Sequence, residues 1–115
     1  MCINRIFYGE DAISHIEKKK DGSRSWLTAR EKRKVKKVSL WKITKESLDL
    51  KMLREYPNLE VIEISGYDEL QPLVLQHIDV LYDFRKLKCL RLSACQFKGE
   101  IDLRKWKRLR TFEID

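Results

Sequence analysis

The chain repeats one spacing of apolar residues three times between positions 53 and 114. Within each set the apolar positions are separated by 3, 3, 3 and then 2 residues. A step near 3 suits a tight turn and a step of 2 suits a strand with alternating faces, so each set predicts a turn that leads into a short strand. The three sets are Leu53, Tyr56, Leu59, Ile62, Ile64; Leu81, Phe84, Leu87, Leu90, Leu92; and Leu103, Trp106, Leu109, Phe112, Ile114.

The segments between these strands predict helices of unequal length. A helix is expected over 70–81, behind Pro72, because the apolar positions there follow i, i+3, i+4 spacing. A second, shorter helix is expected to begin near Thr44, whereas the 99–105 connection is long enough for a turn only. The first helix would bury Leu70, Leu73, Val74, His77, Ile78 and Leu81, and the second Leu48, Met52 and Leu53.

The second set continues into a motif of a known family. Leu87, Leu90, Leu92, Cys95 and Phe97 spell LxxLxLxxCxF, so residues 35–115 resemble a leucine-rich-repeat protein. The resemblance implies an α/β leucine-rich-repeat solenoid with about four parallel strands on its concave face and helices or turns on its convex face. Val35, Val38 and Leu40 form a weaker first strand, and the equivalent positions 38, 62, 90 and 112 are 24, 28 and 22 residues apart.

The segment 98–102 adds a second, shorter likeness. After Phe97 the chain reads Lys-Gly-Glu-Ile-Asp, so Phe97–Ile101 resembles the LxGxI turn of plant-type, immune-receptor-like repeats, with Asp102 where that class carries Pro. The alternative is an ordinary turn in which Gly99 supplies a permissive backbone.

The strand phase predicts which side chains point outward on the concave face. Residues that flank the buried pair of each strand should form three rows across four strands. The rows are Lys37, Val61, Cys89, Thr111; Ser39, Glu63, Arg91, Glu113; and Trp41, Ser65, Ser93, Asp115. The central row can either satisfy its own charges or recognise a charged partner.

The two ends of the repeat array carry different expectations. Residues 1–34 are too apolar for a disordered tail, so we expect them to cap the 35–115 repeat domain. We also expect them to cover Trp41. The alternative is that Trp41 anchors a partner. The last strand has no visible cap. We therefore expect either self-association through the final repeat or a longer parent chain.

The net charge of +7 is uneven and supports a second hypothesis. All of it falls in residues 1–58, and between Lys18 and Lys45 twelve basic residues face two acidic ones. Such a block can bind phosphate, nucleic acid or another anionic surface, with Lys32, Arg33, Lys34, Lys36 and Lys37 as its candidate ligands. The spacing from Lys19 to Lys36 also matches a bipartite nuclear-import signal, for which a solvated basic arm is the alternative.

Two tryptophans lie beside basic residues, as nucleic-acid binding by base stacking would require. Trp26 lies between Arg24 and Arg30, and Trp106 lies within Arg104-Lys105-Trp106-Lys107-Arg108. Trp106 shares the phase of Tyr56 and Phe84, so we expect it to be buried.

The remaining chemistry is sparse. Cys2, Cys89 and Cys95 form no CxxC pair and are expected to be free thiols, which together with the lack of a signal sequence or membrane span favours a cytoplasmic protein. Neither His15 nor His77 belongs to a metal or nucleophile motif, and His77 is expected to be either packed in the core or placed at its boundary.

We therefore expect no enzyme activity, cofactor or metal. The predicted function is a protein interaction module whose concave face binds a partner. The basic first half of the chain predicts either an acidic partner or electrostatically assisted binding. The predicted binding residues are Lys37, Ser39, Trp41, Glu63, Ser65, Cys89, Arg91, Ser93, Thr111 and Glu113.

Overall fold

The computed structural model describes residues 29–114. In chain order the elements are α2 (Ala29–Lys34), β1 (Lys37–Ile43), β2 (Ser47–Asp49), the 3-10 helix η1 (Leu50–Glu55), β3 (Val61–Gly66), β4 (Leu73–Gln76), the 3-10 helix η2 (Ile78–Asp83), β5 (Cys89–Ser93), β6 (Cys95–Gln96), the 3-10 helix η3 (Leu103–Lys105) and β7 (Thr111–Ile114).

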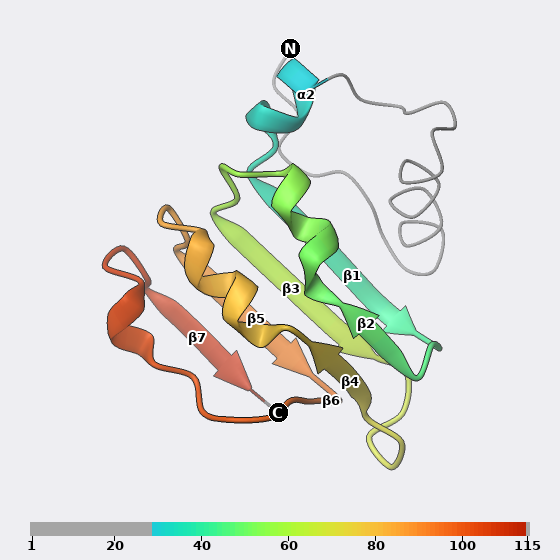
Figure 1. Cartoon of the computed structure of the whole chain (residues 1–115). Coiled ribbons are helices and arrows are strands. Elements are labelled where there is room, and N and C mark those ends of the chain that lie inside the picture. Colours follow the sequence, from blue (N-terminus) through green and yellow to red (C-terminus); the bar gives the residue numbers. More distant parts are fainter. Residues whose placement is uncertain (1–28, 115) are drawn as a thin grey trace.

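The strands form two parallel sheets between which the chain alternates. The larger sheet has the order β1-β3-β5-β7 and the smaller sheet the order β2-β4-β6. Figure 1 shows the four long strands running in one direction, with the short strands and 3-10 helices over one face of them. The described part is thus an α/β fold with parallel strands in two sheets, mostly strand and with little helix.

The core lies between the two sheets and confirms most of the predicted apolar pattern. The first two sets of the repeat are buried at all five positions, and Trp106 of the third set is buried as expected. The third set is otherwise less covered: Leu109 and Phe112 are half-buried, while Leu103 and Ile114 are 44% and 43% exposed. β7 is the last strand of the larger sheet, so no further described strand covers its outer side.

The predicted helix over 70–81 is wrong. Leu70 is 90% exposed, and Leu73 and Leu75 are buried on alternate positions of β4. His77 has a left-handed backbone with φ of 62°, which interrupts the chain before η2 begins. β2 and β6 supply backbone partners for β4, and these partners are distant in sequence, so a local pattern could not reveal them.

The predicted helix near Thr44 is also replaced by a short strand and a 3-10 helix. β2 and η1 occupy this segment, but Leu48, Met52 and Leu53 point inward as predicted. The 99–105 connection holds only the three-residue η3, as expected. Asp49 and Asp102 cap η1 and η3 in the same way, because each carboxylate accepts a hydrogen bond from the backbone N–H two residues later.

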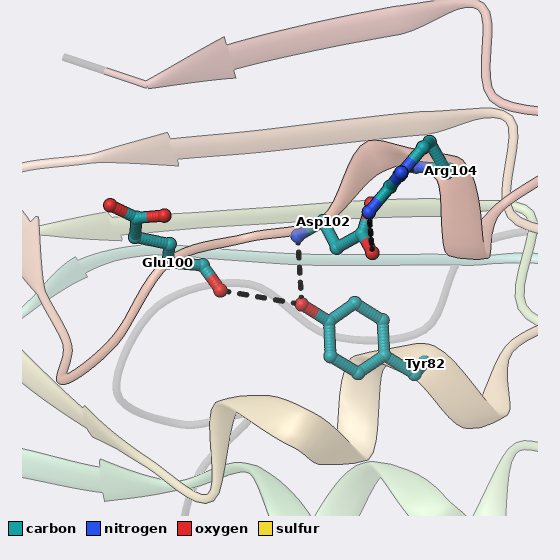
Figure 2. A network of polar contacts seen from close by, with 4 residues as sticks. All are labelled: Tyr82, Glu100, Asp102 and Arg104. Carbon is teal, nitrogen blue, oxygen red and sulfur yellow. Dashed lines mark hydrogen bonds and ion pairs between the residues drawn. The ribbon is translucent and has the colours of Figure 1, made fainter.

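A polar network joins η2 to the segment that leads into η3 (Figure 2). The backbone N–H of Asp102 donates to Tyr82 Oη at 2.9 Å, and Tyr82 Oη donates to the carbonyl of Glu100 at 3.4 Å. Arg104 then closes on the carboxylate of Asp102 through Nε at 2.9 Å. The network fixes the 99–105 connection against the neighbouring turn of the chain.

Candidate functional site

The register of the larger sheet brings the predicted outward residues together. Lys37, Val61, Cys89 and Thr111 lie side by side on successive strands, as do Ser39, Glu63, Arg91 and Glu113. Ser65 pairs with Ser93 in the third row, whereas Asp115 lies outside the described residues. We call this surface the strand face; it consists of the rows just named together with Trp41. Ser39, predicted to be available to a partner, is instead buried with 6% of its surface exposed, and its hydroxyl donates to Glu63.

Glu63 is the centre of the charges on the strand face. Its Oε1 accepts a hydrogen bond from Ser39 Oγ at 3.0 Å and lies 3.4 Å from Lys37 Nζ. Its Oε2 accepts a hydrogen bond from Arg91 Nη1 at 2.7 Å. Arg91 Nε lies 3.3 Å from Glu113 Oε2, so the guanidinium joins two carboxylates across three neighbouring strands.

These contacts determine the ionisation of the face. Burial alone would raise the pKa of Glu63, but hydrogen bonds from Arg91 and Ser39 and the charge of Lys37 hold the pKa below its ordinary value. The hydrogen bond to Glu63 raises the pKa of the Arg91 guanidinium. Both groups are charged at neutral pH. Two positive and two negative side chains balance on the face, so the face itself has no net preference for an acidic partner.

Trp41 borders a small hollow on the strand face. The residue is 42% exposed, and the ammonium of Lys42 lies 5.4 Å from the centre of its ring. The hollow has a volume of about 100 Å³ and includes Trp41, Glu63, Arg91 and Ser93 in its lining. Trp41 lies where the β1–β3 register shifts between Leu40 and Ile43, which a strict two-residue alternation does not predict. The predicted cover from residues 1–34 falls almost entirely outside the described residues.

Two free cysteines lie near or on the face. Cys89 is half-buried on the strand face, and burial raises the pKa of its thiol. Cys95 lies in β6, where burial raises the pKa of its thiol to about 11 and Sγ donates to the carbonyl of Ser93 at 3.1 Å. The free thiols predicted at these two positions are confirmed, while Cys2 lies outside the described residues.

The basic residues predicted to bind phosphate do not share one surface. Lys32 lies on α2 and is 3.1 Å from Glu55 of η1, with only 15% of its side chain exposed. Lys37 belongs to the strand face. Arg33 and Lys34 are exposed at the end of α2, and Lys36 is 4.0 Å from Glu60. The segment before residue 29 lies outside the described residues.

His77 differs from its expectation. It is exposed, so of the two expected placements packing in the core is wrong, and its Nδ1 lies 2.9 Å from Asp49 Oδ1. The pKa of Asp49 is lowered: burial opposes this, but the Lys51 backbone N–H and His77 favour the carboxylate. Sequence reasoning missed this pair because β2 and β4 place the two residues together from 28 positions apart.

Within residues 29–114, no three His, Cys, Asp or Glu side chains gather as a metal site would require. No helix in the same part of the chain has the length and apolar character needed to cross a membrane. Comparison with known proteins matches no protein-family model, no curated protein and no solved structure.

A basic feature of the fold also escaped the sequence interpretation. A four-residue segment precedes each strand of the larger sheet, and we call these segments turns, although the first begins with the last two residues of α2. Three of the four turns have the pattern basic-basic-apolar-basic, namely 33–36, 85–88 and 107–110. This repeated pattern is present in the sequence, but it becomes visible only when the segments that precede the strands are aligned by strand register. The linear charge count instead drew attention to the single basic block at 18–45.

Proposed function

We propose that this chain is a leucine-rich-repeat interaction module and that the strand face binds another protein. The support for the repeat assignment is the apolar spacing together with a chain that alternates between two parallel sheets. The proposal places the partner-binding function on a rigid surface whose side chains come from four strands. A cytoplasmic location and the absence of catalysis remain predictions.

The observation that carries the binding proposal is that Trp41 and Arg91, both exposed, line the same hollow. Tryptophan and arginine are the residue types that most often dominate protein interfaces. Arg91 retains exposed surface, with 47% of its side chain accessible, although two carboxylates hold it in place. A side chain that is already ordered loses less entropy when a partner binds.

A photocrosslinking experiment tests the proposal. A photoreactive amino acid replaces Ser93 on the strand face, and in a matched chain it replaces Gln96 on the smaller sheet. The expected result is a defined crosslinked protein from the Ser93 chain that is absent from the Gln96 chain. Equal crosslinking from both positions would refute the strand face as the binding surface.

The affinity of the purified partner provides the quantitative test. Trp41→Ala and Arg91→Ala should each weaken binding by at least about tenfold, as expected for interface anchors. Tyr67→Ala and Arg104→Ala are matched controls, because both residues are exposed and lie outside the strand face, and they should leave the affinity unchanged. Circular dichroism confirms that each variant is folded before binding is compared.

The second hypothesis concerns anion binding through residues 18–45. Arg33, Lys34 and Lys36 remain its exposed candidates, because Lys32 and Lys37 are engaged by Glu55 and Glu63. The ion pairs leave fewer available cations than the linear sequence suggests. Self-association through β7 likewise remains a prediction, supported by the position of β7 at one edge of the larger sheet.

A further inference from the structure

Four turns precede the four strands of the larger sheet, and they lie together at one end of it, at the upper left of Figure 1 for those before β3, β5 and β7. We call them the basic edge, which consists of residues 33–36, 57–60, 85–88 and 107–110. Nine of these sixteen residues are Lys or Arg and one is acidic, giving +8. Since the whole chain carries +7, the other 99 residues carry −1. The net positive charge of the protein is therefore concentrated on this edge.

Backbone hydrogen bonds hold the turns in a regular stack. The carbonyl of Lys36 accepts from the N–H of Glu60 at 2.7 Å, and the carbonyl of Glu60 accepts from the N–H of Lys88 at 2.7 Å. The carbonyl of Lys88 then accepts from the N–H of Arg110 at 2.8 Å. With neighbouring strands about 4.8 Å apart, the four turns span roughly 14 Å. The cations are thus presented by an ordered backbone rather than by a mobile arm.

Most of these cations are not neutralised by the fold. Glu60 is 3.0 Å from Lys88 and 4.0 Å from Lys36, so its charge is shared between those two lysines. The exposed residues Arg85, Lys86, Lys107, Arg108 and Arg110 form no ion pair with any carboxylate of residues 29–114. A hollow of about 460 Å³ opens at the 107–110 turn and is lined by Lys88, Lys107, Arg108, Leu109 and Arg110.

We propose that the basic edge binds the sugar–phosphate backbone of a nucleic-acid duplex without sequence preference. Arginine and lysine side chains recognise phosphate, and duplex DNA carries a charge on each strand about every 3.4 Å, so the edge faces on the order of four phosphates of one strand. This surface is distinct from the strand face, and the proposal does not depend on a protein partner.

The side chains between the cations favour a duplex over the other polyanions. None of the four turns contains an aromatic residue, so the edge offers no platform on which unpaired bases could stack. Val35, Leu59 and Leu87 are fully buried, and Leu109 is half-buried, so the edge has little apolar surface to insert into a bilayer. A duplex presents its phosphates outward and needs neither stacking nor insertion.

The test compares two variants with the same net charge. The edge variant replaces Lys34, Lys86 and Lys107 with Gln, one from each basic turn, and the control variant replaces Lys42, Lys51 and Lys98, which lie outside the four turns. All six lysines are exposed, and each variant falls from +7 to +4. Fluorescence anisotropy of the full chain measures binding to a labelled random-sequence duplex over a salt series, with single-stranded RNA and anionic phospholipid vesicles as competing probes.

The expected result is micromolar or tighter duplex binding that the edge variant loses by at least about tenfold and the control variant by less than about threefold. In the edge variant, the slope of log affinity against log salt should also become shallower by about 2 to 3, which a folding defect would not produce. Equal losses in the two variants, no duplex binding by the unmodified chain, or tighter binding to single strands or vesicles than to the duplex would each overturn the proposal.

Discussion

The indole Nε1 of Trp106 donates a buried hydrogen bond of 2.7 Å to the main-chain carbonyl of Leu81. The same carbonyl accepts the backbone N–H of Phe84 at 3.3 Å, which closes the end of η2. The ring of Trp106 also lies 5.0 Å from that of Tyr82, centre to centre. Trp106 therefore fixes the end of η3 against η2, both by ring packing and by a hydrogen bond.

Replacing Trp106 with Phe should lower the free energy of unfolding by about 1–2 kcal/mol, because the buried hydrogen bond is lost while an aromatic ring remains. Trp106→Ala should cost about 3–5 kcal/mol through the cavity it creates. Urea denaturation followed by circular dichroism measures both. Leu70→Ala is the control, since Leu70 is 90% exposed and its loss should cost less than about 0.5 kcal/mol. Equal costs for Trp106→Phe and the control would contradict a structural role for the indole N–H.

Gly66→Ala should destabilise the contact between the two sheets. A Cβ at this position would overlap the carbonyl oxygen of Ala94, which already accepts the N–H of Leu73 at 2.8 Å. The backbone must shift to make room, and we expect a loss of about 1–3 kcal/mol in the free energy of unfolding. Ser65→Ala, which adds no atom to the same strand, should cost less in the same urea titration. A Gly66→Ala protein as stable as the parent would show that the backbone at Ala94 can shift to accommodate the methyl group at no cost.

The charge network on the strand face predicts a loss of stability in acid. The folded-state pKa of Glu63 lies below its ordinary value of 4.5. Its contribution is therefore fully present above about pH 4.5 and is lost as the pH falls through the lower folded-state value, where the unfolded chain already binds the proton. Glu63→Gln should remove this part of the pH dependence.

Urea midpoints at pH 7 and near pH 4 measure the effect for the parent chain, Glu63→Gln and Glu69→Gln. Glu69 is exposed and forms no ion pair within residues 29–114, so the urea midpoint of its variant should change with pH as much as that of the parent chain. An identical change in urea midpoint between the two pH values for the parent and Glu63→Gln would mean that Arg91, Ser39 and Lys37 do not favour the carboxylate in solution.

The thiol of Cys95 should react slowly in the folded protein. Burial raises its pKa to about 11, so at pH 8 its thiolate fraction is about 100-fold below that of an ordinary cysteine. The measurement is the rate of reaction with a disulfide reagent in a chain in which Cys2 and Cys89 are replaced by Ser. Addition of urea should restore a fast reaction, and a fast reaction without urea would contradict the burial of this thiol.

Much of the larger sheet could be predicted from the sequence. The step of two between Ile62 and Ile64, and between Leu90 and Leu92, placed the strands and their buried faces correctly, because alternation along a strand is a local property of the chain. The equivalent positions also predicted the register, so Glu63 and Arg91 are paired as expected. The burial of Trp106 followed from its phase in the same pattern.

The smaller sheet could not be predicted in the same way. Its strands are two to four residues long, and Leu73-Val74-Leu75 fits a helical stripe as well as a strand when it is considered alone. Backbone pairing with Leu48 and Cys95 decides the matter, and these partners are more than twenty residues away in either direction.

The sequence by itself determined the apolar spacing, the strands of the larger sheet and the residues that share its outer face, because these depend on the geometry of one short segment at a time. Only the tertiary structure decided which charges are available. It pairs Lys32 with Glu55 and Lys37 with Glu63, and it joins the turn of Lys88 to the turn of Arg110 by a backbone hydrogen bond. Charge neutralisation depends on distances between segments that parallel strand pairing brings together, and a linear charge count contains no such distances.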